Sequence, residues 1–180
     1  MLHTKRLYLR QWELADSDAL DEIANQEHVN RWLPDWLNCR EWVVPWIEKV
    51  NRHYTIDNPI TNYLSWAVVL SDGDRVIGQI NIGSDSFEGK EVGIGYFIDE
   101  NYCNCGYASE AAAALVEHTF KKYGFDHLAA TVQPHNYASI VVVEKVGFKF
   151  IKTIMRKDNG QSEALPFNYY RLYRNHFKEV

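Results

Sequence analysis

The chain has 180 residues, the usual length of one domain, and 46% of them are hydrophobic while 24% are charged. This balance is typical of a globular protein and excludes a disordered or fibrous chain. Its 19 Lys and Arg and its 24 Asp and Glu give a net charge of −5. An acidic surface disfavours binding to a nucleic-acid backbone, which needs clustered cations, but it mildly attracts a cationic substrate.

Cysteine content and hydropathy predict a protein of the cytoplasm. The three cysteines, Cys39, Cys103 and Cys105, are an odd number and include a tight pair, which does not fit a disulfide framework. Two sulfurs without a second cysteine pair do not fit a metal site either, so we expect no metal. No apolar run approaches the roughly 18 to 20 residues of a membrane span, and residues 1–7 lack the apolar run of a signal peptide.

The first third of the chain predicts one strand and two helices. Residues 6–12 alternate polar and apolar side chains, as a half-buried strand does. A short helix follows the N-cap candidates at residues 16–18 and includes Ala24. Apolar side chains at helical spacing predict a second helix from Asn38 to about Tyr54, with Pro45 near its start or at a kink.

The middle of the chain predicts three consecutive strands. Residues 63–70 and 75–82 are strand-like runs, and the turn sequence at residues 71–74 joins them as a hairpin. Residues 91–98 form a third strand, which we expect to pair with the second.

The last part predicts two helices and three strands. Residues 108–123 carry one continuous apolar stripe and form the strongest helix, and residues 127–133 return to a strand. Residues 140–143 are β-branched, but Asn136 as an N-cap and Gly147 as a stop favour a helix there.

A terminal hairpin, residues 148–156 and 165–174 around the turn at 158–160, completes the predicted fold. The sequence thus predicts one α/β (α+β) domain over residues 1–180. It would contain a mostly antiparallel mixed sheet of about seven strands flanked by about four helices.

The segment 101–110 joins the third central strand to the strongest helix. Such a junction presents unpaired backbone N–H groups and the positive end of a helix dipole, which together favour a phosphate. Gly106 allows close backbone approach, and Asn104 tolerates a left-handed conformation. By itself, however, this pattern more often marks a plain turn. A second group, Asn136 with Ser139 followed by residues 144–148, is by itself better explained as a helix cap and a core phenylalanine.

Together, the two groups resemble the GCN5-related N-acetyltransferase (GNAT) superfamily, in particular its ribosomal-protein N-terminal alanine or serine acetyltransferase branch. The segments that carry the resemblance, in chain order, are residues 4–10, 76–80, 95–98, 105–111, 136–139 and 144–148. They span essentially the whole chain.

The resemblance implies a sheet that splays apart beside a coenzyme A site, with acetyl-CoA as co-substrate and no metal. The pantetheine arm would lie along Phe97, Ile98 and Asp99, with Asn136 and Ser139 contacting it from the neighbouring strand end. The pyrophosphate would lie on the backbone of the phosphate loop, made of Asn104, Cys105, Gly106, Tyr107, Ala108 and Ser109.

This chain departs from the family's phosphate-loop pattern, Arg/Gln-x-x-Gly-x-Gly/Ala, which reads Asn101, Asn104 and Gly106 here. Only the last position matches. Asn104 can replace glycine by adopting the left-handed conformation. Asn101 provides a shorter polar side chain, which reduces the contacts available to the pyrophosphate.

The implied reaction is direct attack of an amine on acetyl-CoA in a ternary complex, which needs a base, an oxyanion donor and an acid. A backbone N–H near Ile98 would be the donor. Ser139 matches the serine credited as the acid in the ribosomal-protein branch, while Val143 replaces the tyrosine that other members use. Glu91 and Asp158 are candidate bases, and the alternatives are an exposed strand-end glutamate and a plain Asp-Asn-Gly turn. His135, at the strand end before Asn136, is a third candidate, which would relay protons.

Five of the six tryptophans lie between residues 12 and 46, the region that covers the acceptor site in this superfamily. We expect Trp32 and Trp36 to line the acceptor pocket and Asp35 or Glu41 to hold a cation. Most of the tryptophans are nevertheless better explained by packing of helices onto the sheet.

The sequence therefore predicts an acyltransferase that acetylates a primary amine, foremost a protein or peptide N-terminal α-amine. One alternative acceptor is a small amine such as an amino acid, a polyamine or an antibiotic. Another alternative is a CoA-binding module with little catalysis. The predicted partners are acetyl-CoA and the acceptor, without nucleic acid or membrane, and the chain would be a monomer or a homodimer.

Overall fold

The structure is a computed structural model, which describes residues 1–85, 91–157 and 163–177. These residues form eight strands in one sheet, in the order β1-β2-β3-β4-β5-β6-β8-β7. Every pairing is antiparallel except that of β5 with β6, which is parallel. The strands are β1 (Leu2–His3), β2 (Leu7–Arg10), β3 (Leu64–Leu70), β4 (Val76–Asp85), β5 (Glu91–Ile98), β6 (His127–Val132), β7 (Lys149–Arg156) and β8 (Leu165–Tyr173).

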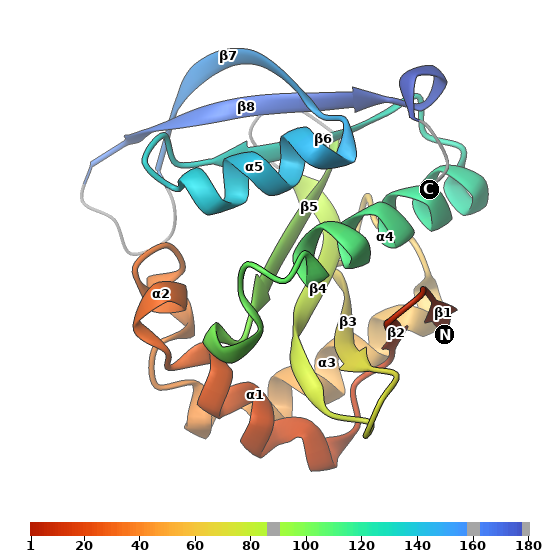
Figure 1. The fold of residues 1–180 in the computed structure, drawn as a ribbon, viewed down its shortest axis with the longest axis vertical. Helices are drawn as coiled ribbons and strands as arrows, with labels where there is room; N and C mark the ends of the chain where they lie inside the picture. The colour runs from red at the N-terminus through yellow and green to blue at the C-terminus, as the bar shows by residue number, and fades with distance from the viewer. Residues whose placement is uncertain (86–90, 158–162, 178–180) are drawn as a thin grey trace.

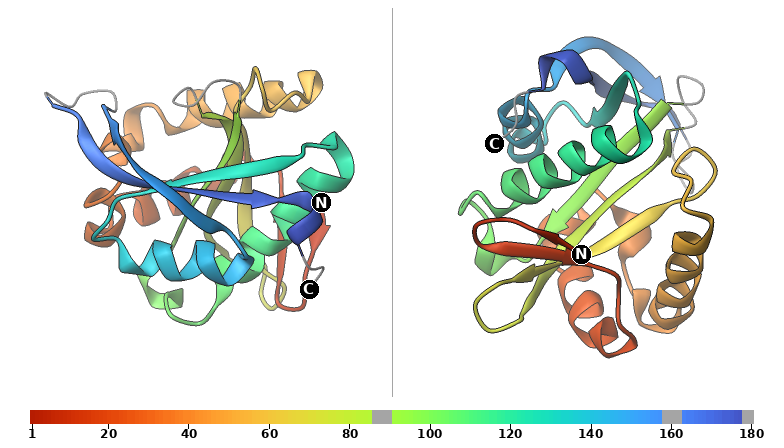
Figure 2. Two further views of the ribbon diagram at one scale, coloured as in Figure 1. Left: turned by 90° about the horizontal axis from the view of Figure 1, so that it is seen from above. Right: turned by 90° about the vertical axis from the view of Figure 1, so that its right-hand side faces the viewer.

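Helices cover both faces of this sheet. They are α1 (Ser17–Ala24), α2 (Glu27–Asn30), α3 (Val43–Ile56), α4 (Tyr107–Tyr123) and α5 (Tyr137–Val146). Figure 2 shows α3 on one side of the strands and α4 with α5 on the other. Two 3₁₀ turns, η2 (Pro34–Trp36) and η3 (Cys39–Glu41), lie between α2 and α3. No helix in the described ranges is both long enough and apolar enough to cross a membrane.

Two apolar clusters hold the helices in place. On one face, α4 and α5 bury Leu115 and Val143 against the strands, and on the other face α3 buries Ile47. Because successive side chains of a strand point to opposite faces, β5 contributes Ile98 to the first cluster and Phe97 to the second. Strand β5 is therefore fixed from both sides.

The predicted elements agree with the structure apart from a few local differences. The structure adds β1 and the short helix α2 to the strands and helices that were expected. The second predicted helix begins at Val43 instead of Asn38, because Asn38 has a left-handed φ of 56° and precedes η3. Pro45 lies in the first turn of α3, where its missing N–H removes no helical hydrogen bond.

The β-branched residues 140–143 are helical, as the N-cap and the stop predicted. The Asn136 side chain accepts the Ser139 N–H at 3.2 Å, and Gly147 ends α5 with a φ of 113°. Strands β7 and β8 pair as the predicted terminal hairpin, while the turn expected at residues 158–160 lies outside the described residues.

Strands β5 and β6 separate soon after they begin. Their parallel pairing is recorded at one position, Gly93 with Ala129. Figure 1 shows β6 and β8 across the top of the view and β4 and β5 running steeply below them. From Ile94 to Ile98, β5 therefore has an open edge inside the sheet, which confirms the splay implied by the family resemblance.

The register of β4 against β5 depends on a small residue, which can be tested. An alanine Cβ at Gly78 would overlap the carbonyl oxygen of Phe97 and lie 2.8 Å from Cδ1 of Ile98. Because paired backbone cannot move aside, we expect Gly78→Ala to lower the free energy of unfolding in urea by about 1–3 kcal/mol. Gly83→Ala is the control, since its Cβ would meet only the Tyr63 ring at 3.3 Å and should cost less. Equal stability of the two variants would contradict this account.

Candidate functional site

The open edge of β5 presents backbone groups to the gap between β5 and β6. The Asp99 N–H donates to the Ile77 carbonyl at 2.8 Å, so it points toward β4. Since backbone groups of successive strand residues point in opposite directions, the N–H and C=O of Ile98 face the gap, as do those of Tyr96 and the C=O of Ile94. The Ile94 N–H points to β6 at the Gly93–Ala129 pairing. A ligand in the gap therefore meets the backbone groups of Tyr96 and the N–H of Ile98.

The phosphate loop lies at the far end of this edge. Asn104 has a φ of 60°, which confirms the left-handed conformation predicted for it, and Gly106 has a φ of 82°. Gly106 is the N-cap residue of α4, and it has no side chain to cap the helix. The first N–H groups of this 17-residue helix, from Tyr107 to Ser109, therefore remain available to an anion.

A polar contact with the N-terminal hairpin holds the phosphate loop in place. The Glu110 carboxylate accepts hydrogen bonds from the Thr4 hydroxyl at 2.6 Å and from Arg6 Nε at 2.7 Å. Arg6 also donates to the Cys105 carbonyl at 3.0 Å. Although burial acts to raise it, the bonds from Thr4 and Arg6 lower the pKa of Glu110, which keeps the carboxylate charged. The turn between β1 and β2 is thus fixed to the start of α4.

The first turn of α5 borders the gap from the other side. The Tyr96 hydroxyl donates to the Ser139 carbonyl at 3.1 Å and so bridges β5 and α5. Burial raises the pKa of Tyr96, so the phenol keeps its proton and remains a donor. Asn136 and Ser139 are thereby held beside the open edge, as the sequence predicted for residues that contact the pantetheine arm.

Glu91 is not the exposed strand-end glutamate considered as an alternative. Its side chain is 11% exposed and lies where β5 and β6 are still paired. It accepts hydrogen bonds from His127 at 2.7 Å, from Tyr169 and from Arg171. Burial acts to raise the pKa of Glu91, but the bonds from Tyr169 and His127 and the charge of Arg171 lower it below the ordinary value. We call these four residues the Glu91 cluster.

The tryptophans mainly pack on one another. The Trp36 ring lies 5.1 Å from Phe97, 5.1 Å from Trp46 and 5.3 Å from Trp42, measured between ring centroids. Trp36 therefore reaches β5, as an acceptor-site residue would, but as part of a packed cluster. Trp32 is partly exposed and Asp35 is exposed.

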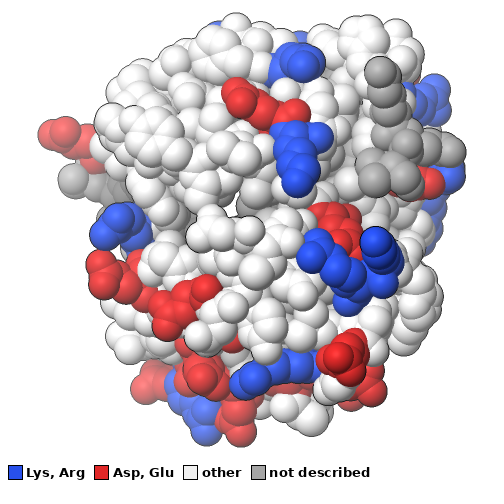
Figure 3. Space-filling view, in the orientation of Figure 1, with Lys and Arg blue, Asp and Glu red and all other residues white. Residues whose placement is uncertain are grey.

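The acidic residues are concentrated in the same region. Residues 13–41 hold eight Asp and Glu against two Arg, whereas the rest of the chain has 16 acidic against 17 basic residues. Figure 3 shows acidic side chains gathered over α1 and α2. The net negative charge of the chain is thus carried by the segment that forms α1, α2, η2 and η3.

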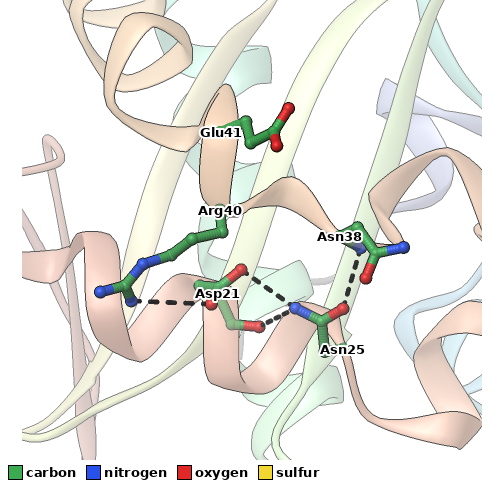
Figure 4. Close-up of a pocket in the computed structure, with 5 residues that line it drawn as sticks. All are labelled: Asp21, Asn25, Asn38, Arg40 and Glu41. Carbon is green, nitrogen blue, oxygen red and sulfur yellow. Dashed lines mark hydrogen bonds and ion pairs between the residues drawn. The ribbon is translucent and has the colours of Figure 1, made fainter.

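A separate pocket of about 530 Å³ opens beside α1 and η3 (Figure 4). In it, Asn25 donates to the Asp21 carboxylate at 3.0 Å and accepts the Asn38 N–H at 2.9 Å. Arg40 lies 3.7 Å from Asp21, and Glu41 completes the lining. None of these residues belongs to the β5 edge or the phosphate loop, so this pocket is not the predicted site.

Sequence reasoning missed two side chains that contact the open edge. His28 of α2 bonds the Ile98 carbonyl at 2.8 Å, and Gln26 donates to the Asp99 carboxylate at 3.2 Å. The partners in each contact are at least 70 residues apart, so no local pattern could reveal them.

The candidate base Asp158 lies outside the described residues. In the described part of the chain, no group of three His, Cys, Asp or Glu side chains could hold a metal ion.

Comparison with known proteins identifies the family. A model of the acetyltransferase (GNAT) domain matches residues 6–149. The chain belongs to the GNAT acetyltransferase family. The uncharacterized N-acetyltransferase YnaD of Bacillus subtilis is 32% identical over 163 residues, which cover 87% of this chain and 88% of YnaD. This GNAT protein is accordingly an acyltransferase, as the sequence predicted.

Solved structures share its fold. A GNAT-family acetyltransferase from Bacillus anthracis has a TM-score of 0.80 and 24% identity, covering 97% of this chain and 98% of that one. RimL, a ribosomal α-N-protein acetyltransferase in complex with coenzyme A, has a TM-score of 0.77 and 16% identity. That match covers 94% of this chain and 95% of RimL.

The Glu91 cluster makes stability depend on pH in a defined direction. A carboxyl whose pKa is lowered by folding stabilises the protein above its unfolded pKa and loses that effect as pH falls through the folded pKa. Replacing Glu91 with Gln should therefore lower the free energy of unfolding by about 3 kcal/mol at pH 7. The difference from wild type should shrink as the pH falls below the ordinary value of 4.5.

Urea unfolding at several pH values measures this difference. Glu117→Gln is the matched control, because Glu117 pairs with Lys121 at the surface and its loss should change stability little. A Glu91→Gln penalty that stays constant down to pH 3, or one no larger than that of Glu117→Gln, would show that the cluster does not stabilise the fold as described.

Proposed function

We propose that this GNAT enzyme transfers the acetyl group of acetyl-CoA to the N-terminal α-amine of a protein or peptide, by direct attack in a ternary complex. The observation that carries the proposal is the open edge of β5, which leads to the uncapped start of α4. A strand edge suits the amides of a pantetheine arm, and a helix N-terminus suits a pyrophosphate. The coenzyme A bound to RimL supports this assignment.

In this arrangement each predicted CoA-binding residue has a defined task. The arm would lie along Phe97, Ile98 and Asp99 on β5, where the backbone groups that face the gap belong to Tyr96 and Ile98, with Ser139 on its other side. The pyrophosphate would accept hydrogen bonds from the loop that begins at left-handed Asn104. Arg6 donates to the Cys105 carbonyl and so holds the backbone of this loop, while its charge is paired with Glu110.

Two observations favour a peptide over a small amine as the acceptor. Within the described ranges, the Trp36 ring packs against Trp42, Trp46 and Phe97, so it is occupied by ring contacts and not turned toward a small amine. The acidic segment 13–41 instead provides a negatively charged surface for a chain whose N-terminus is cationic. RimL is an α-N-protein acetyltransferase, which supports the same choice.

The reaction then has a simple balance. The neutral amine nitrogen attacks the thioester carbon, a new C–N bond forms, and the C–S bond breaks. The Ile98 N–H would donate to the developing oxyanion, and the Ser139 hydroxyl would protonate the departing thiolate.

The amine must also lose a proton, and we assign Glu91 no part in this step. Glu91 and Ile98 are seven residues apart at opposite ends of β5, about 23 Å along a strand, whereas a base must lie within hydrogen-bond reach of the amine or one water away. The Glu91 carboxylate is also held by His127, Tyr169 and Arg171. An α-amine, with a pKa of about 8, loses its proton to water more readily than a lysine or polyamine nitrogen, with a pKa of about 10.4, so an N-terminal acceptor depends least on a base.

A panel of amines tests the acceptor. Consumption of acetyl-CoA should be fastest with peptides that begin with a free alanine or serine. It should be lost when the same peptides carry a blocked N-terminus and keep an internal lysine. Turnover with only amino acids, polyamines or aminoglycosides would transfer the assignment to small amines. Tight CoA binding without turnover on any amine would identify a binding module and overturn the proposal.

The proposed acid can be tested separately. Ser139→Ala should lower kcat by at least about tenfold, because an unprotonated thiolate is a poor leaving group, while the Kd for CoA changes little. Ser71→Ala, in the exposed β3–β4 turn, serves as the control. Unchanged kcat in Ser139→Ala would leave this residue only a helix-start role.

A further inference from the structure

The end of the open β5 edge is held by two side chains at the start of α2, its N-cap Gln26 and His28. His28 Nε2 lies 2.8 Å from the Ile98 carbonyl oxygen, which faces the gap. Gln26 donates to the Asp99 carboxylate at 3.2 Å and accepts the Glu100 N–H at 2.9 Å. The acidic helical segment is thus fixed to the strand end where the proposed oxyanion donor lies.

The geometry defines the tautomer of His28. A carbonyl oxygen only accepts hydrogen bonds, so Nε2 must carry the hydrogen in this contact. In the neutral ring, Nδ1 then has a lone pair, and this atom is buried without a hydrogen-bond partner among the described residues. The His28 ring has two polar contacts among the described residues. Its Nε2 bonds the Ile98 carbonyl and lies 3.8 Å from the Cys103 sulfur.

This contact changes what a ligand meets at the strand end. A free strand edge presents both donors and acceptors, and the lone pairs of the Ile98 carbonyl would repel a second oxygen placed beside the Ile98 N–H. A thioester oxygen that becomes negative during the reaction needs donors alone. The Nε2–H of His28, together with the weaker thiol donor of Cys103 at 3.7 Å, occupies the carbonyl, which leaves the Ile98 N–H as the free group at this position.

We propose that His28 is a positioning residue for acetyl transfer, which masks the Ile98 carbonyl and so makes the end of β5 a donor surface for the thioester oxygen of acetyl-CoA. This inference rests on the proposed function, which lays acetyl-CoA along this edge. His28 acts through Ile98, and because its Nε2–H is bonded to the carbonyl and its Nδ1 is buried, we do not assign it as the base.

Three variants separate this role from others. His28→Ala leaves the Ile98 carbonyl with only the weak thiol donor of Cys103. The Nε2–H₂ of a glutamine in His28→Gln can still donate to the carbonyl but cannot act as a base. His53→Ala is the matched control, because His53 on α3 makes an equivalent bond to a backbone carbonyl, that of Tyr63, at 2.8 Å. Circular dichroism and thermal unfolding show first that each variant is folded.

Turnover is the first readout. We expect His28→Ala to lower kcat by about tenfold or more, as loss of oxyanion stabilisation does, while the Kd for CoA stays within about threefold. His28→Gln should recover kcat to within about threefold of wild type and keep its pH profile. The inference would be overturned by either of two results. One is a kcat of His28→Gln as low as that of His28→Ala, and the other is a kcat of His28→Ala equal to that of wild type.

Infrared spectroscopy of acetyl-CoA labelled with ¹³C at the acetyl carbonyl provides a readout that needs no acceptor. Donors lower the carbonyl stretching frequency, so wild type, His28→Gln and His53→Ala should show a lower frequency than His28→Ala. The same frequency in all four proteins, with acetyl-CoA bound, would overturn the role of His28 but not the proposed function. Failure of wild type to bind acetyl-CoA would overturn both.

Discussion

The parallel pairing of β5 with β6 is recorded at one position, Gly93 with Ala129, and the candidate site depends on what happens beyond it. Each unpaired residue of β5 leaves backbone donors and acceptors without the partners that a continuous sheet would supply. The fold tolerates this because Phe97 and Ile98 are packed in the cores on opposite faces, so the strand keeps its shape with one edge open. A binding site thus arises from an interruption in the sheet.

Separate contacts keep this gap from closing or widening. At its closed end the Glu91 cluster ties β5 to β6 and β8, and across its middle Tyr96 bonds the first turn of α5. At its open end, His28 holds the Ile98 carbonyl, and beyond it Arg6 and Glu110 fix the start of α4. These contacts come from elements far apart in the sequence, which explains why nearly the entire chain is needed to build one site.

Features that depend on local chemistry were predictable from the sequence. The left-handed Asn104, the caps of α5 and the hairpins β3–β4 and β7–β8 follow from turn, capping and alternation preferences. The role of Trp36, the burial of Glu91 and the contact of His28 with Ile98 were not, because each depends on which distant residue lies opposite. Asn38 lies between these two cases. Helical spacing placed it at the start of the predicted second helix, but its φ of 56° makes it the N-cap of the separate turn η3.

The central claim is that the open β5 edge is the acetyl-CoA site, and a crystal structure of the enzyme with acetyl-CoA tests it most directly. We expect the pantetheine arm to hydrogen-bond with the backbone of β5 near Ile98, the pyrophosphate to contact the N–H groups from Asn104 to Ser109, and Ser139 to face the sulfur. Acetyl-CoA bound elsewhere, for example in the pocket beside Asp21 and Arg40, with the gap between β5 and β6 empty, would contradict the account.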